Sequence, residues 1–229
     1  IHSALLKANE IPDPYIGKNE SLVQWVAQTP WLIKRTFSLS EEDLNQAALE
    51  LWLESLDTIA TISINQQPLY QASNQFKRHI INIKPAVTLG VNEIEIVFHP
   101  VAEVAADRAS KLPFPVPWAV GNNQVPHMNT VRKAQCHAGW DWGICLLVAG
   151  LYKKPLIKPI ENISLRYVEH TQQFSEQGCT VSVTVEYQAY QSGQHTFVAQ
   201  LGEQQLKQTL TVCEGLHTVK FDFIIPEPK

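Results

Sequence analysis

The chain has 229 residues, of which 45% are hydrophobic and 17% are charged, as expected for a globular protein of one or two domains. Its formal charge of -4 and its pI near 6.1 give no electrostatic reason to expect nucleic acid as a partner. No run approaches the roughly 20 apolar residues of a transmembrane helix, so we expect no membrane partner either.

Alternation of apolar and polar residues, which is the period of a half-buried strand, dominates the first part of the chain. A polar turn at Asn65 to Pro68 interrupts the third of the predicted strands. Only 99–112 ("HPVAEVAADRASKL") predicts a helix, which ends before the prolines of "PFPVPW". The strands predicted ahead of this helix span, in chain order, 31–39, 48–56, 58–70, 77–83 and 92–100.

The segment 121–138 has no clear periodicity and carries several polar side chains. Long irregular loops in compact domains are more often functional than idle, so we expect this one to contribute to a site. The apolar run 144–160 ("ICLLVAGLYKKPLIKPI") then predicts a buried strand. Its two Lys-Pro steps indicate a crossing into a second unit, which places the domain boundary at Lys158.

Residues 159–229 continue the alternation at short, regular intervals, which is typical of an immunoglobulin-like β-sandwich. Such a domain has roughly 100 residues, more than this segment supplies, so we expect it to be incomplete. The sequence thus predicts an all-β fold class with two domains, 1–158 and 159–229. The strands of the second domain are predicted at "ISLRYVEH", "TVSVTVEYQAY", "HTFVAQL", "QQLKQTLTV" and "HTVKFDFII".

The four cysteines do not indicate a disulfide framework, because they are sparse and form no CxxC motif. We therefore expect a reducing compartment and a cytoplasmic location. Since the chain begins with Ile, we also expect its natural start to lie upstream. A zinc site at Cys136, His137 and Cys145 would lack a fourth donor, so we expect no metal, and no spacing indicates an organic cofactor.

The stretch "CHAGWDWGIC" (136–145) places one carboxylate, Asp141, between Trp140 and Trp142. Indole faces stack on the C–H faces of a pyranose ring, and an ionised carboxylate accepts hydrogen bonds from sugar hydroxyls. The stretch therefore indicates a carbohydrate subsite. The alternative is that both tryptophans anchor a sandwich core, with Asp141 in a turn beside Gly139 and Gly143.

Two motifs resemble family 2 glycoside hydrolases. The stretch "RKAQCHAGWDWG" (132–143) resembles the signature of the β-mannosidase branch, and "LDTIATISINQQPLYQASNQF" (56–76) resembles the family's sugar-binding domain. The segments 2–26 and 149–157 resemble those that lead into and out of that domain, so nearly all of 1–158 is covered. The resemblance implies a jelly-roll, galactose-binding-like β-sandwich for the first domain.

The resemblance also implies roles for individual residues. Asp141 matches the family's acid that touches the terminal sugar, and Trp140 and Trp142 match its flanks. One tryptophan is expected to line the sugar pocket while the other packs behind it. Asn74, in "NQF", falls where relatives place a second polar contact to the sugar, and its alternative role is that of a turn residue.

Other residues of these motifs are expected to support the site without binding sugar. Arg132 and His137, both in the signature, are expected behind the sugar ligands, and a bidentate pair from Arg132 would hold a carboxylate in place. Asp57 is expected to have a structural role in a turn between two strands. The signature departs from the family at Ile144, where proline is expected, and at Ala138, where an aromatic is commoner.

In this family the sandwich packs against a catalytic TIM barrel and sends a loop over its mouth. Both carboxylates of the retaining mechanism come from the barrel, and nothing in 1–229 predicts repeated βα units. The resemblance implies that the chain, without turnover of its own, belongs to an enzyme that hydrolyses terminal, non-reducing β-D-mannose residues with retention. Its expected partners are the β-mannoside oligosaccharide and an intramolecular TIM barrel.

Three alternatives stay open at this point. A stand-alone carbohydrate-binding sandwich would need a complete ligand pocket, which one carboxylate and two indoles do not make. A purely structural domain would leave Asp141 without a ligand. Within the family, a β-galactosidase or β-glucuronidase remains an alternative parent, because the missing barrel sets most of the substrate choice, although the WDWG stretch favours mannose.

Overall fold

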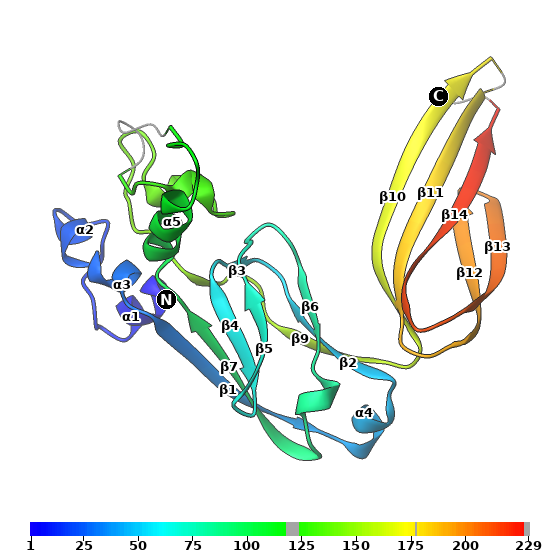
Figure 1. The fold of residues 1–229 in the computed structure, drawn as a ribbon, viewed down its shortest axis with the longest axis horizontal. Coiled ribbons are helices and arrows are strands. Elements are labelled where there is room, and N and C mark those ends of the chain that lie inside the picture. The colour runs from blue at the N-terminus through cyan, green and yellow to red at the C-terminus, as the bar shows by residue number, and fades with distance from the viewer. Residues whose placement is uncertain (118–123, 177, 227–229) are drawn as a thin grey trace. The chain divides into compact units, whose positions relative to one another are not determined.

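The structure, a computed structural model, describes residues 1–117, 124–176 and 178–226. It is built mostly from strands, with little helix, which confirms the all-β fold class predicted from the sequence (Figure 1). The chain divides into two compact units. Unit 1 consists of Ile1–Leu44 and Glu50–Lys158, and unit 2 consists of Asn45–Leu49 and Pro159–Lys229.

The largest sheet of unit 1 has four antiparallel strands in the order β1-β7-β4-β5. Along β4 every second residue is buried, so the alternation turns Ala60, Ile62 and Ile64 toward the core. Asn65 and Gln66 have positive φ and close the β4–β5 hairpin inside the predicted polar turn. The four strands are β1 (Trp31–Leu39), β4 (Ala60–Ile64), β5 (Gln67–Ala72) and β7 (Gly90–Phe98).

Two smaller sheets lie mainly in unit 1, although the first residues of β2 and the last of β9 belong to unit 2. One has the order β6-β2-β9, and in the other β3 pairs antiparallel with β8. The latter pairing sets Asp57 opposite Gly150, which joins two parts of the chain that are distant in sequence. The five strands are β2 (Ala48–Leu53), β3 (Leu56–Asp57), β6 (His79–Asn82), β8 (Gly150–Leu151) and β9 (Leu156–Ile160).

The strand predicted over 144–160 is wrong in its first part. Residues 144–149 are irregular, and strand structure is confined to β8 and β9. Leu147 has a φ of 49°, in the left-handed region, which no extended strand adopts. Cys145, Leu146 and Leu147 are nevertheless buried. The apolar run therefore indicated correctly that these residues are buried, but not that they form a strand.

The helix predicted over 99–112 is confirmed as α5 (Val101–Ser110). The expectation that it is the only helix is wrong, because short helices of four to six residues also form, too short for an amphipathic period to show in the sequence. In Figure 1, α1, α2, α3 and α5 gather at one end of unit 1. None of the described helices is long and apolar enough to cross a bilayer. The short helices are α1 (His2–Lys7), α2 (Asn19–Leu22), α3 (Trp25–Gln28) and α4 (Glu41–Asn45).

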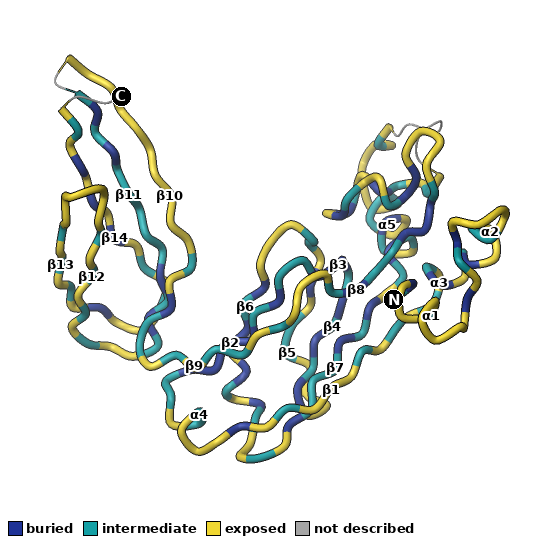
Figure 2. Tube along the Cα trace, turned by 180° about the vertical axis from the view of Figure 1, so that it is seen from behind, coloured by how far each residue is buried: buried dark blue, intermediate teal, exposed yellow. Residues whose placement is uncertain are grey.

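Unit 2 contains two sheets of antiparallel strands, one in the order β10-β11-β14 and the other pairing β12 with β13. Its core includes Cys179, Tyr187, Val219, Phe221 and Phe223. Figure 2 shows β10 exposed along most of its length, whereas β11 is mostly covered. The strands, all anticipated by the sequence alternation, are β10 (Ile163–Ser175), β11 (Gly178–Ala189), β12 (Gly193–Leu201), β13 (Gln204–Val212) and β14 (Gly215–Ile225).

Candidate functional site

The loop that carries the WDWG residues ends in a tight turn, here called the loop tip (140–143). The Gly143 amide donates a hydrogen bond to the Trp140 carbonyl oxygen at 2.6 Å, and Asp141 has a φ of 43°. A Cβ atom on Gly143 would lie 2.9 Å from that carbonyl oxygen, so the turn in this form requires glycine. Asp141 therefore does occupy a turn beside Gly143.

Both tryptophans of the loop tip are exposed. Trp140 is 60% exposed and Trp142 is fully exposed. The interpretation in which they anchor the sandwich core is therefore wrong. Asp141 is exposed between them, so the loop tip presents a carboxylate flanked by indoles. Exposed aromatic surface of this kind is typical of a contact site rather than of a folding core.

Two limbs of the chain, 133–138 and 145–148, support the loop tip and are here called the loop base. The Leu147 amide joins them by donating to the His137 carbonyl at 2.8 Å. The second limb is also held at Cys145, whose amide donates to Glu20 Oε1 at 2.8 Å and whose carbonyl accepts from Gln24 Nε2 at 2.9 Å. Residues in and beside the short helices α2 and α3 thus fix the position of this limb.

Apolar packing also holds the loop base. Ala138 and Leu147, one from each limb, belong to a buried cluster that includes Val101 of α5 and Met128. Leu146 belongs to a second cluster, whose other buried members come from the N-terminal segment that carries α1 to α3. The helices at this end of unit 1 therefore surround the loop base with apolar side chains. The second cluster's other members are Ile11, Val23 and Val26.

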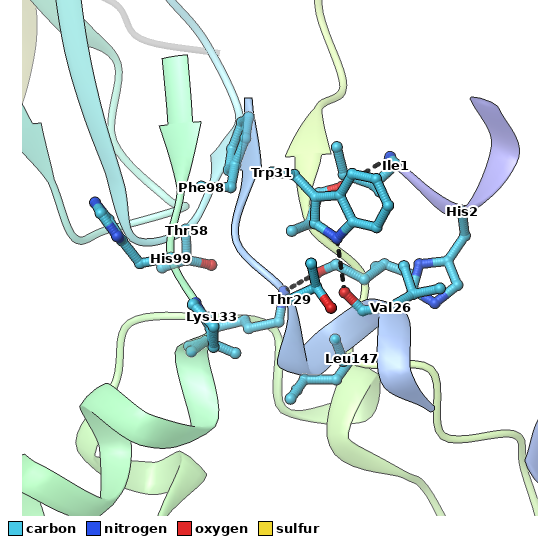
Figure 3. Close-up of a pocket in the computed structure, with 15 residues that line it drawn as sticks. Ile1, His2, Val26, Thr29, Trp31, Thr58, Phe98, His99, Lys133 and Leu147 are labelled. Carbon is cyan, nitrogen blue, oxygen red and sulfur yellow. Dashed lines mark hydrogen bonds between the residues drawn. The ribbon is translucent and has the colours of Figure 1, made fainter. Parts of the chain in front are cut away.

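A buried ion pair links the loop base to strand β3. Lys133 Nζ lies 2.6 Å from Asp57 Oδ1 and 2.5 Å from Oδ2, and it also donates to the Val148 carbonyl at 2.6 Å. Lys133 is 2% exposed and Asp57 is 0% exposed. The Tyr152 hydroxyl donates to Asp57 Oδ2 at 2.7 Å, and the Thr58 hydroxyl donates to Oδ1. Figure 3 shows Lys133 and Thr58 among the side chains around a narrow pocket of unit 1.

The surroundings of Asp57 favour its ionised form. Burial raises the pKa of a carboxyl group, but the His137 ring, the Lys133 ammonium and the Thr58 hydroxyl together outweigh it and lower the pKa of Asp57 below its usual value. The pKa of Lys133 is lowered by burial, which the negative charge of Asp57 opposes. Burial and the Asp57 charge raise the pKa of Tyr152, so its phenol stays a hydrogen-bond donor.

The structure brings Asn74 and Arg132 together through their backbones. They form an isolated parallel bridge, and the Gln75 amide donates to the Arg132 carbonyl at 2.9 Å. Asn74 Oδ1 accepts from the Phe76 amide at 2.9 Å, which is the contact of a turn residue. The Arg132 guanidinium lies 5.9 Å from the centroid of the Phe76 ring, and it forms no ion pair with any described carboxylate. The bidentate pair expected of Arg132 is therefore not found among the described residues.

His137 lies within the loop base, behind the loop tip. Its Nδ1 atom is 3.3 Å from Asp57 Oδ2, and this is the contact through which the ring lowers the pKa of Asp57. Its carbonyl oxygen joins the two limbs through Leu147, as described above. The ring and the backbone of this residue therefore contact the supporting groups of the loop.

Sequence reasoning missed three residues that hold the loop base, namely Lys133, Glu20 and Gln24. Lys133 lies inside the signature stretch, but no periodic pattern there indicates that a lysine is buried. Glu20 and Gln24 are more than a hundred positions away from Cys145, which they bind. Asp57 was expected only to have a structural role in a turn. In the structure its carboxylate accepts hydrogen bonds from Lys133, Tyr152 and Thr58.

The described residues contain no group of three or more His, Cys, Asp and Glu side chains that is placed to hold a metal ion. All four cysteines have free thiols. Cys136 is exposed and Cys145 is buried, with its Sγ atom 3.9 Å from the His137 carbonyl oxygen. The loop tip itself presents an exposed carboxylate and exposed indole surface.

Residues 1–153 match the family described as "Glycosyl hydrolase 2 galactose-binding domain-like". The chain belongs to this family. The match covers the whole loop, from the Asp57–Lys133 ion pair to the loop tip, and it confirms the resemblance to family 2 glycoside hydrolases.

Similar proteins of known sequence include β-mannosidases. The chain is 31% identical over 227 residues to "Beta-mannosidase B" of Thermothelomyces thermophilus, a match that covers 96% of this chain and 26% of that protein. It is 30% identical over 177 residues to the "Beta-mannosidase" of Bos taurus, covering 75% of this chain and 20% of that protein. The chain thus spans about a quarter or less of these relatives.

Solved structures agree on the fold. The β-D-mannosidase from Dictyoglomus thermophilum superposes with a TM-score of 0.82 at 24% identity, over 98% of this chain and 28% of that one. The exo-chitosanase from Amycolatopsis orientalis superposes with a TM-score of 0.67 at 15% identity, over 98% of this chain and 24% of that one. At these identities the likeness concerns the fold.

Proposed function

We propose that the complete protein containing this chain is a retaining β-mannosidase that removes terminal, non-reducing β-D-mannose residues from oligosaccharides. In this proposal the chain is its non-catalytic N-terminal part, and its loop tip forms one wall of the sugar subsite. A TIM barrel outside this chain carries both catalytic carboxylates. The observation that carries the proposal is the exposed Trp140–Asp141–Trp142 turn on a loop base held by hydrogen bonds and a buried ion pair.

The chemistry of the loop tip supports a sugar as its ligand. An ionised Asp141 accepts hydrogen bonds from hydroxyl groups, and an indole face packs against the C–H face of a pyranose ring. Either exposed tryptophan is available for this contact, and the other is available to pack against the neighbouring barrel. Asn74, whose backbone lies beside that of Arg132, is proposed as a second polar contact.

The loop tip by itself is not a complete sugar site, which supports a second domain as partner. One carboxylate and two exposed indoles on a protruding turn leave most of a monosaccharide in solvent, whereas ligand pockets bury most of the ligand surface. Retaining hydrolysis also needs two carboxyl groups roughly 5 to 5.5 Å apart. Asp141 would then act by positioning: hydrogen bonds that strengthen as the sugar ring distorts accelerate the reaction without proton transfer.

The similarity to β-mannosidases supports mannose over other sugars. The curated relatives named above both carry that description, and the match to Thermothelomyces thermophilus extends over both units of this chain. A β-galactosidase or β-glucuronidase would have to combine this N-terminal part with a barrel of different specificity.

The test is hydrolysis of aryl β-D-mannoside, β-D-galactoside and β-D-glucuronide by the full-length protein encoded by the reading frame that contains this chain. We expect the mannoside to be cleaved fastest, with the β-anomer of mannose as first product in a proton NMR time course. The chain alone should show neither turnover nor saturable binding of mannose at micromolar concentration. Turnover or tight binding by the chain alone would favour a self-sufficient carbohydrate-binding sandwich. Faster cleavage of the galactoside or the glucuronide would contradict the proposal that the substrate is a β-mannoside.

A further inference from the structure

The Asp57–Lys133 ion pair connects three segments of unit 1 that are distant in sequence. Asp57 ends strand β3, Lys133 lies in the first limb of the loop base, and the Val148 carbonyl, which also accepts from Lys133, lies in the second limb. A single ammonium group therefore joins both limbs to the sheet. Tyr152, just beyond β8, adds a hydrogen bond to the same carboxylate.

Stability alone does not explain this arrangement. Removing two charges from water costs free energy that their attraction in the interior often fails to recover, and apolar pairs of similar volume are commonly as stable. Apolar clusters pack against the loop base and the pair is shielded from water, so this desolvation cost applies in full. The hydrogen bonds from one ammonium to the Asp57 carboxylate and to the Val148 carbonyl, however, constrain angle as well as distance, which apolar packing does not.

The geometry of the loop transmits this constraint to Asp141. The Leu147–His137 hydrogen bond sets the spacing of the two limbs, and the Gly143–Trp140 hydrogen bond closes the turn above them. Between these two bonds the chain has few residues in which a displacement could be absorbed. A shift of Lys133 relative to Val148 therefore moves the loop tip.

We infer that Lys133 and Asp57 are positioning residues for sugar recognition by Asp141. They hold the loop tip at the place where its carboxylate meets the substrate, without touching the substrate themselves. This inference rests on the proposed function, because it needs the full-length protein to act on a β-mannoside. According to this inference the buried pair contributes to the kcat/KM of the full-length protein as well as to the stability of its fold.

The test is a double-mutant cycle in the full-length protein, with kcat and KM measured on aryl β-mannoside for D141A, D57N/K133M and D57N/K133M/D141A. The paired substitution removes both charges together, so it leaves no buried charge unpaired. We expect D57N/K133M to lower kcat/KM roughly 10- to 100-fold, because misplacement by about 1 Å can cost about 100-fold. In the D141A background the same pair of substitutions should lower kcat/KM less than about twofold, since interacting residues are not additive.

A matched control separates positioning from loss of stability. Asn92 is a buried polar residue of unit 1 whose side chain forms hydrogen bonds with Asn65 and with the backbone of Thr88 and Gly90. It lies near the start of β7, whereas α5 follows the other end of that strand. We expect N92A to lower the melting temperature while kcat/KM per folded molecule stays unchanged. Y152F provides a mild variant that removes one hydrogen bond to Asp57, and it should lower kcat/KM by a few-fold with the same non-additivity.

The outcomes distinguish this inference from the proposed function. If D141A keeps the full rate, the proposed role of the loop tip fails. If D141A loses rate but D57N/K133M does not, or if the two effects multiply, the positioning role is overturned while the proposed function stands. Should D57N/K133M fail to yield folded protein, Y152F decides: an unchanged kcat/KM, or an effect that multiplies with that of D141A, overturns the inference.

Discussion

The loop base and the loop tip lie within a few residues of each other in one chain, yet their surroundings are opposite. In the loop base Lys133, Ala138 and residues 145–147 are buried, Lys133 is paired with Asp57, and apolar clusters pack against both limbs. The loop tip is exposed, its two indoles lie open, and its carboxylate forms none of the ion pairs found among the described residues. Residues of the loop base therefore stabilise the fold, whereas those of the loop tip are available to a ligand. Substitutions in the loop base are expected to change stability, and those in the loop tip to change activity.

The largest effect on stability is expected at the loop base. Lys133→Met alone leaves the Asp57 carboxylate buried without its ammonium partner. Breaking a buried pair from one side costs about 3–5 kcal/mol of unfolding free energy. Urea denaturation of the chain, followed by circular dichroism, measures this loss. D57N/K133M should recover part of it, and a loss below about 1 kcal/mol for K133M would contradict the importance of the pair.

The second prediction concerns pH. The pKa of Asp57 is lowered in the folded protein, so its ionisation contributes stability that is complete above the unfolded pKa of about 4. This contribution is lost as the pH falls through the lower, folded pKa. The difference in melting temperature between the wild type and D57N/K133M should therefore shrink as the pH falls below about 4. A difference that is constant from pH 6 to about pH 2.5 would mean that folding does not lower the pKa of Asp57.

The third prediction changes the shape of the loop tip while sparing the loop base. Gly143→Ala places a Cβ atom 2.9 Å from the Trp140 carbonyl oxygen, so the turn must open. We expect kcat/KM on aryl β-mannoside to fall roughly tenfold, with unfolding free energy lowered by about 1 kcal/mol. Gly17→Ala is the control, because Gly17 has a φ of 58° and open space around it. It should lose similar stability but no activity, and equal loss of activity in both variants would rule out a specific role of the turn.

The smallest effect on stability is expected from Trp142→Ala. Trp142 is fully exposed, so its removal should change the unfolding free energy of the chain by no more than about 0.5 kcal/mol. Trp31, whose Nε1 atom donates to the Val26 carbonyl at 2.8 Å, is the matched tryptophan of the same unit. Trp31→Ala should cost more than about 1 kcal/mol. A large loss for W142A in the chain alone would mean that this indole packs within the fold.

The regular parts of the structure were predictable because their signal is local. Alternation in segments such as 31–39 indicates a strand, and β1 has these bounds, with Trp31, Ile33 and Phe37 half-buried and Leu39 buried. The motif around Asp141 was recognisable for a similar reason, since an acid between two tryptophans is a local pattern. Whether those tryptophans face a core or solvent depends on the rest of the fold, and the sequence left both interpretations open.

The support of the loop was not predictable from local patterns. Lys133 is buried because a strand that ends at Asp57 lies beside it, and Glu20 binds Cys145 across 125 positions of sequence. The run 144–149 is apolar but irregular, because Leu147 adopts a left-handed conformation that brings its amide to the His137 carbonyl. These features depend on contacts between segments that are distant in sequence, and local patterns in a single sequence do not indicate such contacts.

The most direct test of the account compares wild-type full-length protein with Asp141→Ala on aryl β-mannoside, with melting temperatures recorded on the same samples. The account predicts that kcat/KM falls roughly 10- to 100-fold, as for loss of a hydrogen bond to a charged group, while the melting temperature is unchanged. An unchanged rate would contradict it, because Asp141 would then be only a residue of an exposed turn.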